Sequence, residues 1–191
     1  MSASPYLTAE AAPSMNPAMS PGMSNDHVAG TGIEGLDHIL VGGLPRNRVY
    51  LVQGDPGVGK TTLGLQFLLE GHKQGEKGMY VTLSESSEEL HAVAKSHGWS
   101  LEGIEVHEQL IGETELQEAE TTVFYPAEIE LGETVRAILT QVDRVKPQRV
   151  VIDSLSEIRL LAQSSLRYRK QILALKQFFA GRKVTVICLD E

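Results

Sequence analysis

The stretch QGDPGVGKTTL, residues 53–63, lies between an apolar run and a leucine-rich segment. From Gly54 to Thr61 it matches the spacing G-x-x-x-x-G-K-[ST], in which glycines let backbone N–H groups turn inward around a phosphate. The apolar run predicts a strand over residues 48–54, and the leucine-rich segment predicts a helix over residues 61–75. A loop with this spacing binds phosphate when it connects a strand to a helix. We therefore interpret the stretch as a phosphate-binding loop rather than an ordinary glycine-rich turn.

Two side chains of this Walker A loop have specific expected roles. Lys60 is expected to reach the β- and γ-phosphates of a nucleotide, so that it serves both binding and catalysis. The Thr61 hydroxyl is expected to coordinate Mg²⁺. The residues expected to contact the nucleotide are Gly54, Asp55, Pro56, Gly57, Val58, Gly59, Lys60, Thr61 and Thr62.

A nucleotide-bound metal needs a second protein ligand, and Asp153 is the candidate. It ends the apolar run RVVID, which predicts a strand over residues 149–154. Together with the phosphate-binding loop, this position favours a metal-side carboxylate. The alternative is that Asp153 caps the helix that follows, a role that Ser154 could share.

Hydrolysis also needs a group that orients and deprotonates the attacking water, and Glu85 is the candidate for this catalytic role. It follows the predicted strand over residues 78–84 and is therefore expected at the carboxyl end of that strand. Glu88 and Glu89 are better explained by helix capping, because Ser86 and Glu89 have the spacing of a capping box. The alternative for Glu85 is a solvated turn residue.

Strands and helices alternate along the chain. Continuous apolar strands in such an alternation predict a parallel α/β sheet with helices on both faces, whose ligands bind at the carboxyl ends of the strands. Between residues 100 and 122 the chain is polar and acidic, which predicts a solvated loop outside the core, or alternatively an interaction tail. The remaining predicted elements are helices over residues 31–40, 86–99, 127–145 and 166–181 and a strand over residues 184–189.

The length and composition of the chain limit which kinds of protein it can be. With 191 residues and 41% hydrophobic content, the chain is long enough for one globular domain. The net charge of −8 argues against a large sequence-independent contact with nucleic acid, which needs clustered Lys and Arg. The single cysteine, Cys188, lies in an apolar run, which indicates a buried thiol and favours a reducing compartment. We therefore expect a cytoplasmic location.

The first 28 residues differ from the rest of the chain. They are rich in Ser, Ala, Pro and Met, and they lack the charged and apolar regions of a signal peptide. No run of the chain approaches the roughly 18 apolar residues that span a bilayer. We expect a flexible tail over residues 1–28, a domain over residues 29–191 and no membrane segment.

Other candidate residues have simpler explanations. The basic cluster of Arg167, Arg169 and Lys170 is more typical of a solvated helix face than of contact with a partner or nucleotide. Four histidines lack the paired spacing of metal ligands and are expected at the surface: His72, His91, His97 and His107.

Residues 29–191 resemble the KaiC-like branch of the RecA superfamily of ATPases. This resemblance implies a three-layer, RecA-like P-loop NTPase core, ATP with Mg²⁺, and ring-forming homo-oligomers, commonly hexamers, with nucleotide at subunit interfaces. Carried onto this chain, residues 54–62 match the nucleotide loop and Asp153 matches the metal-side aspartate. The segments that carry the resemblance are TGIEGLDHILVGGLP, GDPGVGKTTLGLQFLLEG, VTLSESSEEL, RVVIDSLSE and VTVICLDE.

Two departures from the family pattern bear on function. Where KaiC has two adjacent glutamates after the second strand, this chain has Ser84 and Glu85, so hydrolysis is expected to be slow or differently arranged. The family core also continues past the strand over residues 184–189, with basic residues that reach a neighbour's nucleotide. We therefore expect a domain that is incomplete at its C-terminus and leaves an unpaired sheet edge.

These patterns lead to one main hypothesis and three alternatives. The main hypothesis is an Mg²⁺-dependent ATPase that drives an oligomeric or signalling switch, with a signalling protein as its partner. The alternatives are a nucleotide-binding regulatory module with little hydrolysis, a KaiC-type serine/threonine autokinase, and a DNA-handling relative, which the acidic balance disfavours.

Overall fold

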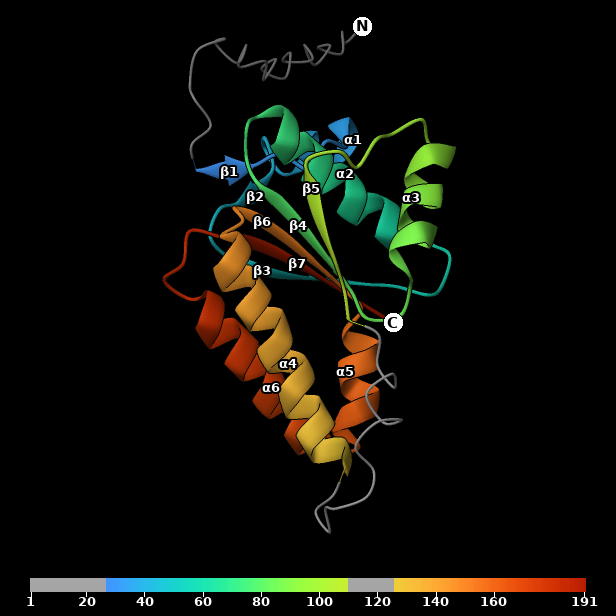
Figure 1. Ribbon diagram of the computed structural model, residues 1–191. Helices are drawn as coiled ribbons and strands as arrows, with labels where there is room; N and C mark the ends of the chain where they lie inside the picture. The colour runs from blue at the N-terminus through green and yellow to red at the C-terminus, as the bar shows by residue number, and fades with distance from the viewer. Residues whose placement is uncertain (1–26, 110–125) are drawn as a thin grey trace, which may run out of the picture.

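The computed structural model describes residues 27–109 and 126–191. Within these residues, five parallel strands form a sheet in the order β3-β7-β6-β4-β5 (Figure 1). A separate antiparallel pair joins β1 (Val28–Ala29) to β2 (Leu44–Pro45). The strands of the main sheet are β3 (Val49–Gln53), β4 (Gly78–Thr82), β5 (Ile104–Glu108), β6 (Arg149–Asp153) and β7 (Thr185–Asp190).

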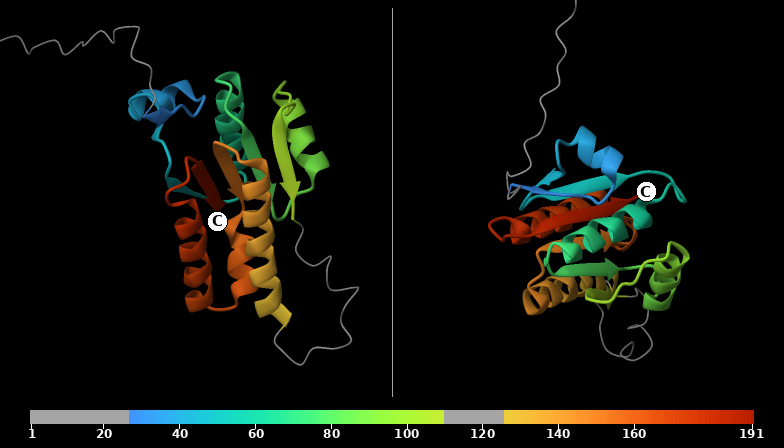
Figure 2. Two further views of the ribbon diagram at one scale, coloured as in Figure 1. Left: turned by 60° about the vertical axis from the view of Figure 1, so that its left-hand side comes forward. Right: turned by 90° about the horizontal axis from the view of Figure 1, so that it is seen from above.

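Helices cover both faces of the sheet, as the sequence predicts (Figures 1 and 2). One face packs against α2 (Lys60–Lys73) and α3 (Ser87–Ser96). The other face packs against α4 (Pro126–Val145), α5 (Leu155–Ala162) and α6 (Ser165–Phe179). A short helix, α1 (Glu34–Ile39), lies between β1 and β2 in the chain and buries none of its residues.

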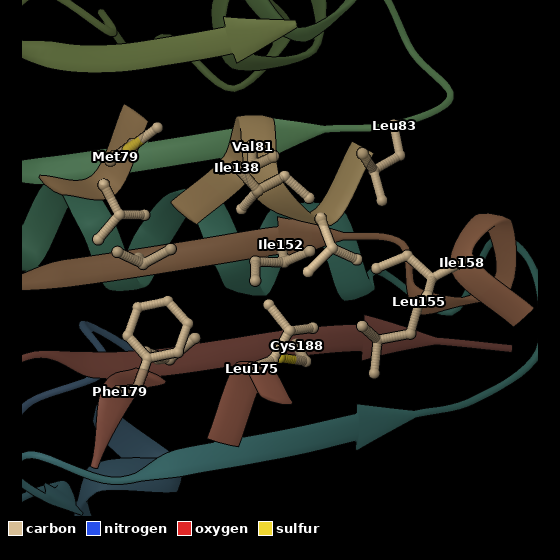
Figure 3. Packing of buried hydrophobic residues seen from close by; sticks show 14 of the residues in the cluster. Met79, Val81, Leu83, Ile138, Ile152, Leu155, Ile158, Leu175, Phe179 and Cys188 are labelled. Carbon is tan, nitrogen blue, oxygen red and sulfur yellow. The ribbon is translucent and has the colours of Figure 1, made fainter. Parts of the chain in front are cut away.

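The two apolar clusters arise from the alternation of side chains along each strand. On β4, Met79 and Val81 point toward α4, while Tyr80 belongs to the cluster beneath α2. Figure 3 shows the first cluster, in which Cys188 of β7 lies beside Leu175 of α6. Cys188 is a buried side chain, 5% exposed, as predicted, and burial raises the pKa of its thiol to about 12.

The prediction of a loop throughout residues 100–122 is wrong at its start, where β5 (Ile104–Glu108) forms an edge strand parallel to β4. Its side chains alternate, with Ile104 and Val106 contacting the cluster beneath α2 and polar residues between them. The sequence of such an edge strand looks polar because only one of its faces is buried. The acidic residues that follow lie in 110–125, outside the described residues, as does most of the expected tail.

The opposite edge of the sheet is β3, which carries the loop over residues 54–59. Among the described residues β3 pairs with β7 alone, so its outer edge is unpaired, and Leu51 is 57% exposed there. A groove of about 1040 Å³ lies beside it, with an apolar lining that includes Leu51, Leu166 and Leu173.

A buried arginine fixes the end of the sheet that is distant from the loop. The Arg149 side chain is completely buried, and its Nε donates to Glu76 Oε2 at 2.6 Å. Its guanidinium also donates to the backbone carbonyls of Gly30 and Phe67, so it ties the N-terminal segment and α2 to β6. In the part of the chain that the structure describes, no helix has the length and apolar content to cross a membrane.

Candidate active site

The loop over residues 54–59 leads from the carboxyl end of β3 into α2. Gly57 and Gly59 adopt φ angles of 80° and 93°, in the left-handed region that favours glycine. A Cβ atom at either position would meet nothing within 4 Å, so the backbone conformation rather than crowding requires glycine here. Gly59 is the N-cap of α2 and supplies no side-chain acceptor, and the first turn of α2 contains no acidic residue. The first amides of this helix are therefore available to an anion.

Lys60 places a positive charge at this loop. Its ammonium group donates to the carbonyl oxygens of Gly54 at 2.6 Å and Asp55 at 3.0 Å. Among the described residues, no carboxylate lies within salt-bridge distance of Lys60, so no protein anion neutralises its charge. The arrangement combines backbone donors with one ammonium group, which is the chemistry that binds a polyphosphate.

Asp153 lies where the sequence predicts a metal-side carboxylate. The Thr61 hydroxyl donates to its Oδ2 at 2.9 Å, although the two residues are 92 positions apart in the sequence. The N-cap of α5 is Ser154, so the Asp153 carboxylate faces the loop instead of capping that helix. Asp153 is 9% exposed, which leaves its carboxylate largely shielded from bulk water.

A hydroxyl and a carboxylate at this distance fit Mg²⁺. Magnesium binds to proteins through one or two hard oxygen ligands and takes its remaining ligands from phosphates and water. No group of three or more His, Cys, Asp or Glu residues that could hold a metal occurs in the described part of the chain. The pair of Thr61 and Asp153 could therefore hold a metal only together with the oxygens of a bound nucleotide.

Glu85 lies close enough to Asp153 for the two carboxylates to repel each other. The Thr82 hydroxyl fixes its backbone, since it donates to the Glu85 carbonyl at 2.7 Å and accepts from the Glu85 amide at 3.0 Å. Burial, the Asp153 charge and the Glu89 charge raise the pKa of the Glu85 carboxyl. Its Oε2 atom is buried and has no hydrogen-bond partner among the described residues. An unpartnered carboxylate oxygen can accept a proton from a water molecule.

The neighbours of Glu85 in the sequence have structural roles. Ser86 and Glu89 form both hydrogen bonds of the capping box at the start of α3, which confirms that prediction. Glu88 lies in the same first turn, where its negative charge interacts favourably with the positive end of the helix dipole. Ser84, which the family resemblance marks as a departure from the expected pattern, is exposed.

The other predicted candidates lie elsewhere. Arg169 and Lys170 line the groove beside β3 and α6 instead of the loop. Of the histidines, His97 stacks on Trp99, and His107 is partly buried on β5.

Sequence reasoning missed Tyr80, whose hydroxyl donates to Asp153 Oδ2 at 2.5 Å. Burial and the Asp153 charge raise the pKa of this phenol, so it stays protonated and acts as a donor. A tyrosine inside an apolar strand has the pattern of an ordinary core aromatic residue, so the sequence contains no signal that would single it out.

A family model described as the KaiC ATPase matches residues 29–191. The chain belongs to the KaiC ATPase family. This membership confirms the family that the sequence motifs predict, and with it a RecA-like α/β core.

Similar proteins come from archaea and from bacteria. The UPF0273 protein PH0284 of Pyrococcus horikoshii is 31% identical over 168 residues, which cover 84% of this chain and 67% of the relative. The circadian clock protein KaiC3 of Synechocystis is 30% identical over 161 residues, which cover 84% of this chain and 32% of the relative. The crystal structure of the KaiC-like protein PH0186 from Pyrococcus horikoshii matches with a TM-score of 0.68 at 28% identity, covering 86% of this chain and 72% of that one. The chain thus spans about two-thirds of the length of its UPF0273 relatives.

Proposed function

We propose that this KaiC-family chain binds ATP with Mg²⁺ at residues 54–62 and hydrolyses it, and that hydrolysis switches the state of an oligomeric or signalling assembly. The observation that carries the proposal is the junction of Thr61, Asp153 and Glu85 at one end of the sheet. The pair proposed to hold the metal adjoins a carboxylate whose Oε2 atom has no hydrogen-bond partner among the described residues, and a nucleoside triphosphatase needs both features.

Each residue has a separate task in this proposal. The amides of the loop and the first turn of α2 bind the phosphates, and Lys60 leaves the carbonyls of Gly54 and Asp55 to contact the β- and γ-phosphates. Thr61 and Asp153 would hold Mg²⁺, which, when bound, neutralises the charge that develops on the phosphate oxygens. Glu85 orients the attacking water and accepts its proton.

Three variants test this division of tasks. We expect Lys60→Ala to abolish steady phosphate release because the ammonium contributes to both binding and catalysis. Glu85→Gln should lower phosphate release at least about 100-fold while ATP still binds, since only the proton acceptor is lost. Glu88→Gln is the control, because Glu88 lies at the start of α3 and serves the helix dipole. Phosphate release that is unaffected by Lys60→Ala would contradict the proposal.

A second candidate function rests on Ser84, which leaves one carboxylate where KaiC has two. In this alternative the chain binds Mg²⁺–ATP as a regulatory module and hydrolyses it slowly, or transfers its γ-phosphate to a protein hydroxyl. Tight binding without phosphate release would favour the regulatory module. Radiolabel from γ-labelled ATP that remains on the protein would favour the autokinase.

We also propose that the chain forms a homo-oligomer and that ATP changes its size. The proposal follows from family membership and from the expectation of rings, commonly hexamers, that the resemblance implies. Analytical ultracentrifugation with and without Mg²⁺–ATP measures it. A particle mass of one chain under both conditions would contradict this part of the proposal.

A further inference from the structure

Tyr80 lies in the middle of β4 and is completely buried. Its ring belongs to the apolar cluster beneath α2, together with Leu65 and Val151. The phenol hydroxyl nevertheless contacts a carboxylate. It donates to Oδ2 of Asp153, which lies on the neighbouring strand β6, and the two oxygens are 2.5 Å apart. A buried hydroxyl needs a partner, but a bond to the proposed metal-side carboxylate also fixes where that carboxylate points.

The two oxygens of Asp153 are not equivalent. Tyr80 and Thr61 both donate to Oδ2, and within the described residues no hydrogen bond reaches Oδ1. Rotation of the carboxylate would break both bonds and leave the buried Tyr80 hydroxyl, a donor, without an acceptor. Oδ1 is therefore the oxygen that remains available to a metal ion or to a water molecule bound to it.

Thr61 by itself fixes the orientation of the Asp153 carboxylate only weakly, because the Thr61 hydroxyl has two roles. Its oxygen is a proposed ligand of Mg²⁺, while its proton goes to Asp153. Tyr80 is not a proposed metal ligand, since its hydroxyl lies inside the core, where it donates to Asp153 and lies beside the Thr61 hydroxyl. Partners of this kind, one layer outside a metal ligand, strongly affect metal affinity.

We infer that Tyr80 is a positioning residue, which holds the Asp153 carboxylate with Oδ1 toward the metal and so sets the contribution of Mg²⁺ to nucleotide affinity. This inference rests on the proposed function, because it needs a metal–nucleotide complex in the loop. It predicts that removal of one buried hydroxyl weakens the metal-dependent part of binding and leaves the metal-independent part intact.

The test measures ATP affinity by calorimetry in excess Mg²⁺ and again in a chelator. The ratio of the two dissociation constants gives the gain in affinity that the metal provides. We expect Tyr80→Phe to reduce this ratio about tenfold and to leave the affinity in chelator unchanged. Tyr50→Phe is the matched control, since Tyr50 donates to the Pro45 carbonyl at 2.6 Å outside the site, and its ratio should equal that of the wild type.

A second variant separates the hydroxyl from the packing of the ring. Tyr80→Met also lacks the hydroxyl but fills the core differently, so both variants should lose the same metal-dependent gain whatever their melting temperatures. In an Asp153→Asn background, Tyr80→Phe should have no further effect on the ratio, because the carboxylate that it positions is gone.

The outcomes distinguish this inference from the proposed function. If the wild type shows a metal-dependent gain and Tyr80→Phe retains it within about twofold, Tyr80 is a core residue only and the inference is overturned. If the wild type binds no ATP in either condition, the proposed function fails and takes the inference with it.

Discussion

The Glu85 carboxylate is held at a cost to stability. One of its oxygens is buried without a partner, and the nearby Asp153 carboxylate repels it. Unfavourable placement of this kind is typical of residues that serve chemistry, since a solvated turn glutamate would turn toward water. The sequence leaves the solvated turn open as an alternative, and the unpartnered oxygen favours the catalytic role.

Glu85→Gln should therefore stabilise the protein at neutral pH, by about 0.5–1 kcal/mol, a modest value because the side chain is only partly buried and solvent screens its charge. The folded state raises the pKa of Glu85, so folding favours its protonated form. The wild type consequently loses stability relative to the variant as pH rises from the ordinary glutamate pKa of 4.5 through the raised value.

Urea unfolding of both proteins across this pH range checks the expectation. The difference in the free energy of unfolding should vanish below the pKa of the unfolded carboxyl and reach its maximum above that of the folded one. A variant that is less stable than the wild type at neutral pH would show that Glu85 has a structural partner.

The functional roles of some residues can be predicted from the sequence, and those of others cannot. The loop, Asp153 and Glu85 follow from motif spacing and from positions at strand ends, because phosphate and metal chemistry restricts the residue types there. Tyr80 does not follow, because its role depends on the register of β4 beside β6, which pairs Tyr80 with Val151 and brings its hydroxyl to Asp153.

Among the elements, α2 joins the loop to the far end of the sheet. Its N-terminus begins at Lys60, and near its C-terminus Gly71 lies against the buried Arg149 side chain. A Cβ atom on Gly71 would lie 2.5 Å from both Cδ and Nε of Arg149. Because the Arg149 guanidinium is fixed by its bonds to Glu76 and to backbone carbonyls, it cannot move aside cheaply.

Gly71→Ala should thus destabilise the protein by about 2–3 kcal/mol through overpacking, although alanine favours a helix over glycine. Gly132→Ala in α4 is the matched control. It also lies inside a helix, but a Cβ atom there would meet nothing within 4 Å, so it should gain about 0.5–1 kcal/mol. Thermal unfolding of the two variants compares them. Equal effects would mean that Arg149 can relax around the added methyl group.

Element prediction fails where burial is one-sided. The continuous apolar strands β4, β6 and β7 are evident from the sequence because both of their faces are covered. The strand β5 is not evident, because its alternating residues lie among acidic neighbours and resemble a solvated loop.

In the whole molecule, the order of the strands creates the site. β4 pairs with β6, so their carboxyl ends bring Glu85 and Asp153 together, and α2 crosses the same face with Thr61 at its start. The sequence predicts a parallel sheet with ligands at the carboxyl ends of its strands, but alternation alone does not give the strand order.

Every function proposed for this chain depends on the binding of a triphosphate by the loop amides and Lys60. Isothermal titration of ATP with Mg²⁺ into the folded wild-type chain and into Lys60→Ala measures this binding. We predict saturable heat for the wild type and a loss of affinity of at least about tenfold for Lys60→Ala, since the ammonium makes a charge-assisted contact to the phosphates. No heat from the wild type, or equal affinity for both proteins, would contradict the account.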